Sequence, residues 1–133
     1  MKSRLLLGGL LIVGLFSVGI VAGRGVEVAS HRQWTLVNFV NPVQVKGQFL
    51  MGPYMILHDD AKMARGEACT SIYRFDRQGG PKEKVLEFHC RPAQRDVCPT
   101  AKFTITPNPN GGIPKLAEYQ FAGDSEGHGV PEK

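Results

Sequence analysis

The histidines and cysteines are the residues of this chain whose side chains could carry metal or thiol chemistry. The 133-residue sequence contains four histidines, of which His58 is followed directly by Asp59. No C-x-x-C, H-x-x-x-H or H-E-x-x-H spacing, the marks of common zinc sites, is present. The sequence therefore predicts no metal site and no cofactor. If a metal is bound, the candidate ligands are His58, Asp59, His89 and His128.

Three cysteines, Cys69, Cys90 and Cys98, suggest a disulfide instead. A hairpin that turns at Gly79-Gly80 opposes Cys69 to Cys90, and glycines suit the positive φ of tight turns. Directly opposed cysteines can be bridged, so we predict a Cys69–Cys90 disulfide. A Cys90–Cys98 bond is the alternative, and either choice leaves one thiol over.

The same hairpin register predicts which side chains enter the core. It opposes Tyr73 to Leu86 and places Phe75 on the same face, together with Phe88. Because both strands then bury their apolar sides together, the alternation of side chains supports this register.

Nucleophilic catalysis finds little support in the sequence. Ser71 lies within a predicted strand and lacks the G-x-S-x-G elbow, and Ser125 lies in a polar segment. Cys98 could pair with His89 or His128, although no spacing requires it. The sequence thus favours a protein that is not an enzyme.

The N-terminal segment, residues 1–30, has the pattern of a targeting segment. Lys2 and Arg4 precede the uncharged apolar run from Leu5 to Ala22, the order of a secretory signal peptide. Eighteen helical residues span roughly 27 Å, so an uncleaved anchor with membrane contact through this run is the alternative. Either way, the rest of the chain is expected to be exported, periplasmic or extracellular.

Charge excludes one class of partner. The chain has 16 Lys+Arg and 12 Asp+Glu, a formal charge of +4. Residues 1–30 hold Lys2, Arg4, Arg24 and Glu27, so the remainder carries +2. Without a basic stripe, a nucleic-acid binder is not expected.

Residues 31–122 read as an all-β domain. Short alternating runs separated by Gly, Pro and Asn predict about seven antiparallel strands in a β-sandwich or small barrel, behind one N-terminal apolar helix. The expected strands are 33–40, 43–45, 54–58, 68–76, 84–90, 102–106 and 115–121. Residues 59–66 could form one helical turn capped by Asp59 or Asp60, and residues 123–133 are expected to be a polar tail. Four aromatic residues alternate along these strands and are expected in the core: Trp34, Phe39, Tyr54 and Tyr119.

Two stretches carry a resemblance to known proteins. The first runs Asn41-Pro-Val-Gln-Val-Lys-Gly-Gln-Phe-Leu50 and continues as Gly52-Pro-Tyr54. The second combines Pro114-x-Leu116 with Gly123-Asp124-x-x-Gly127-His128. Together they resemble a family of small exported bacterial β-rich proteins of uncharacterised function. The resemblance implies a β fold and export, and it implies no activity.

These observations predict a non-enzymatic, exported cell-envelope domain that acts as a structural or interaction module with a protein or envelope partner. The alternative is a periplasmic or extracellular binding protein for a metal ion or a small apolar ligand. Convergence of the histidines would favour the metal.

Overall fold

The computed structural model describes residues 31–132, which form eight strands and one short helix. The predicted apolar helix before residue 31 lies outside the described residues. Within residues 31–132 there is no helix of the length and apolarity that a membrane span needs. The elements are β1 (Arg32–Val45), β2 (Gln48–Asp59), α1 (Asp60–Ala64), β3 (Thr70–Asp76), β4 (Gly80–Phe88), β5 (Arg91–Gln94), β6 (Lys102–Thr106), β7 (Lys115–Gln120) and β8 (Glu126–Gly129).

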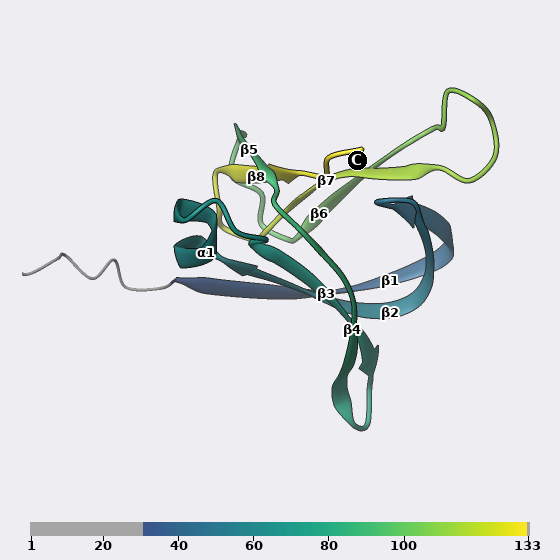
Figure 1. Ribbon diagram of the computed structural model, residues 1–133, viewed down its shortest axis with the longest axis horizontal. Coiled ribbons are helices and arrows are strands. Elements are labelled where there is room, and N and C mark those ends of the chain that lie inside the picture. The colour runs from purple at the N-terminus through teal and green to yellow at the C-terminus, as the bar shows by residue number, and fades with distance from the viewer. Residues whose placement is uncertain (1–30, 133) are drawn as a thin grey trace, which may run out of the picture.

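All eight strands belong to one sheet, in the order β4-β3-β2-β1-β7-β8-β5, with β6 paired to β7. The prediction of a mostly β domain is confirmed. The sheet is mixed rather than purely antiparallel, because β1 and β7 run parallel where Gln44 pairs with Lys115. Figure 1 shows β1–β4 on one side of the molecule and β5–β8 on the other.

In the β1–β2 hairpin, two of the predicted strand ends are wrong. Its turn is Lys46-Gly47, where both residues have positive φ, as a two-residue hairpin turn requires. Asn41-Pro42 does not end a strand but lies in a register shift inside β1, between Phe39 and Val43. A bulge accommodates the proline there, because proline has no amide hydrogen for the ladder. Gly52-Pro53 likewise lies inside β2.

The predicted register of the β3–β4 hairpin is wrong. The turn comes earlier, Asp76 pairs with Gly80, and Ile72 rather than Tyr73 faces Leu86. Since side chains alternate, this one-residue shift exchanges the two faces of β3. Ile72 is fully buried, whereas Tyr73 is only half-buried.

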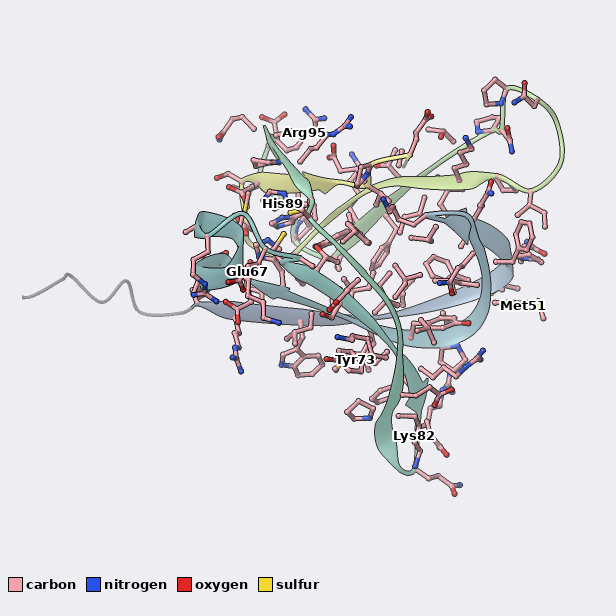
Figure 2. All side chains as sticks on the ribbon, viewed as in Figure 1. Met51, Glu67, Tyr73, Lys82, His89 and Arg95 are labelled. Carbon is pink, nitrogen blue, oxygen red and sulfur yellow. The ribbon has the colours of Figure 1, made fainter. Side chains whose placement is uncertain are left out.

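One core lies between the two parts of the sheet, and Figure 2 shows side chains from both parts filling this space. Three of the four predicted core aromatics are buried there: Phe39, Tyr54 and Tyr119. Trp34 is the exception, with 62% of its surface exposed on the outer side of β1. Thr70 Oγ1 and the Tyr119 hydroxyl are hydrogen-bonded, which ties β3 to β7 across the core.

The segment 123–133, predicted to be a polar tail, contains β8. Its residues pair with Tyr119 of β7 on one side and with Pro92 of β5 on the other. The composition misleads because Gly127 and His128 pair through their backbones, which need no apolar side chains. The helical turn at 59–66 is confirmed as α1, with Asp59 as its N-cap.

Candidate functional site

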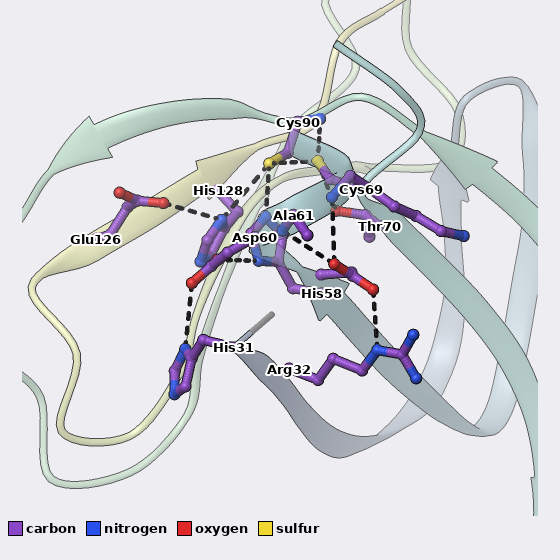
Figure 3. A network of polar contacts seen from close by, with 12 residues as sticks. His31, Arg32, His58, Asp60, Ala61, Cys69, Thr70, Cys90, Glu126 and His128 are labelled. Atoms are coloured by element: carbon purple, nitrogen blue, oxygen red, sulfur yellow. Dashed lines mark hydrogen bonds and ion pairs between the residues drawn. The ribbon is translucent and has the colours of Figure 1, made fainter. Parts of the chain in front are cut away.

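Three side chains from other parts of the chain surround the Cys90 side chain (Figure 3). The Cys90 Sγ lies 3.1 Å from Cys69 Sγ, 3.4 Å from His58 Nε2 and 3.5 Å from His128 Nδ1. The ligand atoms of His58, Cys69 and Cys90 all lie within 4.8 Å of one another. We call His58, Cys69, Cys90 and His128 the Cys2His2 cluster. It is buried, since none of the four residues is more than 2% exposed.

Local structure explains how each member of the cluster is aimed. Tyr54, Ile56 and His58 alternate inward along β2, and all three are buried. Cys69 directly precedes β3, and Cys90 lies between β4 and β5. His128 comes from β8, in the other part of the sheet, and its ring lies 4.2 Å from that of His58 between centroids.

Both imidazoles of the cluster are neutral at ordinary pH. Burial lowers the pKa of His58, against the opposing effect of Asp60. Burial, followed by the facing His58 ring, lowers the pKa of His128 to about 4. A neutral imidazole keeps a free lone pair on one nitrogen, which is the form that binds metals.

The second feature of the cluster is the protonation of its cysteines. Burial, followed by the hydrogen bond with Cys69, raises the pKa of Cys90 to about 12. A thiol of this kind is a poor nucleophile, which argues against Cys90 as a catalytic group. Coordination to a metal ion would deprotonate it. The Cys90 backbone amide already donates to Cys69 Sγ at 3.2 Å, a contact that stabilises a sulfur ligand.

Each histidine of the cluster has a carboxylate nearby, but the two carboxylates are placed differently. Asp60 Oδ1 lies 3.1 Å from His58 Nδ1, on the far side of the ring from Cys90, although the contact lacks the geometry of a hydrogen bond. A carboxylate at this place is positioned to orient a metal-bound imidazole. Glu126 Oε1 lies 3.6 Å from His128 Nδ1, the same nitrogen that faces Cys90, so it does not support that ring from the far side. The other nitrogen of that ring, Nε2, is buried without a hydrogen-bond partner among residues 31–132.

The distances at Cys90 approach those of a tetrahedral metal site, although the ligand atoms that all lie within 4.8 Å of one another are those of His58, Cys69 and Cys90, without His128. With Zn–S near 2.3 Å and Zn–N near 2.0–2.1 Å, tetrahedral geometry sets an S···N separation of about 3.6 Å and an S···S separation of about 3.8 Å. The two S···N distances at Cys90, 3.4 and 3.5 Å, are close to that value. The sulfur atoms at 3.1 Å would have to separate by roughly 0.7 Å to reach the tetrahedral value.

Two of the four candidate ligands from the sequence lie outside the cluster. His89 is exposed, and its Nδ1 contacts the Cys90 carbonyl oxygen at 2.9 Å. The Asp59 carboxylate accepts hydrogen bonds from Ala61 N and Arg32 Nε. His58 and His128 do meet. Cys69 and Cys90 were not among the predicted ligands, although the predicted register placed them opposite each other.

The predicted Cys69–Cys90 disulfide is not formed in this structure. A disulfide bond is about 2.05 Å long, whereas the two Sγ atoms are 3.1 Å apart and both thiols are free. Cys98 is half-buried and its thiol donates to the Phe121 carbonyl oxygen.

An open acidic hollow lies beside the histidines. Asp60, Asp124 and Glu126 line it, together with His31, whose Nδ1 lies 3.2 Å from Asp60 Oδ2. Burial raises the pKa of Glu126, and the like charges of Asp124 and Asp60 add to the effect. The hollow thus offers a cation a favourable potential close to the cluster, through Asp60 and Glu126, which contact the two buried histidines.

No protein-family model matches the chain, and the searches of curated proteins and of solved structures gave no match either.

Proposed function

We propose that the protein is an exported, non-enzymatic metal-binding domain whose Cys2His2 cluster holds a zinc ion. The observation that carries the proposal is the position of Cys90 Sγ, within 3.5 Å of one further sulfur and two imidazole nitrogens. Two sulfur and two nitrogen ligands in a tetrahedral arrangement suit zinc. His128, which contacts Cys90 Sγ, would have to move closer to the other three ligands; four protein ligands then complete the coordination, and the ion would be structural, with no open position for catalysis.

Export and the structural or interaction role remain part of the proposal. Residues 1–30 would direct the domain out of the cytoplasm, as the order of charged and apolar residues predicts. Trp34 and Leu36, exposed on the outer side of β1, favour contact with an envelope partner. Closure of the bent sheet into a sandwich or barrel, and the resemblance to small exported β-rich proteins, stay predictions. Recovery of the chain in the cytoplasmic fraction would contradict the export part.

The test is metal analysis of protein purified without a histidine tag and under reducing conditions. We expect about one zinc ion per chain, lost in Cys90→Ser and His128→Gln. Cobalt substitution should give intense tetrahedral ligand-field bands and sulfur-to-cobalt charge transfer in the near ultraviolet.

The chain offers matched controls for both residue types. Cys98→Ser and His89→Gln remove a cysteine and a histidine outside the cluster and should keep full zinc content. Circular dichroism of each variant separates loss of metal from loss of fold. Folded wild-type protein without zinc or a cobalt spectrum would overturn the proposal.

A further inference from the structure

The two cysteines of the cluster are closer to each other than a zinc site requires. Their Sγ atoms are 3.1 Å apart. That is between the S···S separation of about 3.8 Å in a tetrahedral zinc dithiolate and the bond length of about 2.05 Å in a disulfide. Both cysteines lie outside the strands, one before β3 and one after β4. Small movements of these two short segments can therefore reach either state.

The metal also changes the chemistry of the sulfur atoms. Without metal, Cys69 and Cys90 are free cysteines, and a thiol reacts with oxidants more slowly than a thiolate does. Zinc binding turns both thiols into thiolates, which are nucleophiles, and holds them side by side. The zinc-bound form is then the form that a small oxidant can attack.

We propose that peroxide oxidises the zinc-bound Cys69–Cys90 pair to a disulfide and thereby releases the ion. The inference rests on the proposed zinc site and adds its regulation. One thiolate attacks a peroxide oxygen, giving a sulfenic acid and one water molecule after protonation. The second thiolate attacks the sulfenic sulfur, so that the S–S bond forms and the S–O bond breaks; the hydroxide that leaves takes a proton from solvent and becomes the second water molecule. Two electrons pass from the sulfur atoms to hydrogen peroxide, and the zinc keeps its charge.

Loss of both sulfur ligands leaves the ion on His58 and His128 alone. Two neutral imidazoles supply half of a tetrahedral shell and no negative charge, so affinity falls steeply. Asp60 and Glu126, which contact these histidines, also line the acidic hollow, so carboxylates lie close by for the departing cation. Reduction of the disulfide would restore the site.

The experiment treats zinc-loaded, reduced full-length protein with stoichiometric hydrogen peroxide. Released zinc is followed with a chromophoric indicator, and the intact mass is measured in parallel. We expect nearly complete release together with a mass loss of about 2 Da, the two thiol hydrogens. A thiol reductant should reverse both changes.

Trypsin separates the three cysteines into peptides 66–74, 85–95 and 96–102, so the bond can be assigned. A link between the first two peptides, retained in Cys98→Ser, supports the inference. Zinc that stays bound, zinc lost without a disulfide, or a bond that involves Cys98 would overturn it. If the reduced protein binds no zinc from the start, the proposed function fails instead, and the two failures are distinct.

Discussion

His58 and Cys90 contact each other although 32 residues separate them in the chain. Adjacent residues can differ sharply in burial: His89 is exposed to solvent, whereas Cys90, the next residue, is fully buried. Side chains of adjacent residues in extended backbone point to opposite faces, so only one of the two can reach the core. Residue type alone therefore does not identify a ligand. The side of the extended chain on which the side chain lies decides whether it can reach the cluster.

Asp60 should tune the metal affinity without touching the metal. Its carboxylate lies 3.1 Å from His58 Nδ1, the ring nitrogen that does not face Cys90, and a small adjustment would make it a hydrogen-bond acceptor there. We expect Asp60→Asn to weaken zinc binding by about 10- to 100-fold, the usual effect of removing such a carboxylate. Competition with a chromophoric chelator measures this shift. Asp96→Asn, which changes an exposed carboxylate, is the matched control, and an unchanged affinity in Asp60→Asn would rule out the positioning role.

At the scale of elements, α1 depends on one cap. The Asp59 carboxylate accepts from Ala61 N at 3.0 Å and Lys62 N at 3.2 Å, and it pairs with Arg32. Because Asp59 is also the last residue of β2, the cap fixes the direction in which the chain leaves the strand. His58 lies directly before it, so the cap supports the cluster as well.

We expect Asp59→Ala to lower the free energy of unfolding by about 1–2 kcal/mol, because two amide hydrogens of α1 lose their acceptor. Asp59→Asn should lose less, since asparagine caps helices as well as aspartate does. Urea denaturation of the three proteins gives the comparison. Equal losses in both variants would show that the Arg32 ion pair, and not the cap, carries the stabilisation.

Elements differ in how well local sequence predicts them. β6 and the α1 turn follow directly from alternation and capping residues. The β3–β4 register failed because two glycines in a row allow several turns, and each shift of one residue exchanges the faces. β5 and β8 were missed because four-residue strands rich in Gly, Pro and polar residues carry no alternating apolar pattern.

For the whole molecule, the cluster joins the two parts of the sheet. His58 and Cys69 come from the part that holds β2 and β3, His128 comes from β8 in the other part, and Cys90 lies in the link between β4 and β5. Direct pairing between the parts is limited to β1 and β7. An ion bound by all four residues would cross-link these parts, and it would bind only the folded chain.

Metal removal should therefore lower the melting temperature. Zinc at a hundredfold excess over its Kd stabilises the fold by about 2.7 kcal/mol. For a domain of about 100 residues, each kcal/mol shifts Tm by about 4–8 °C. We expect a chelator to lower Tm of the wild type by about 10–20 °C and to leave Cys90→Ser unchanged. An identical Tm with and without chelator would speak against an ion that links the two parts.

The sequence by itself determined the β character of residues 31–122, the helical turn at α1 and two of the four cluster residues, because alternation, caps and residue types are local properties. Only the tertiary structure decided that His58 and His128 meet, that Cys69 and Cys90 join them, and that His89 and Asp59 do not. The cluster draws one side chain from each of four segments, and no spacing along the chain records how a bent sheet brings β2 against β8. That juxtaposition depends on long-range pairing and on a shared core, which a one-residue change of register would have altered.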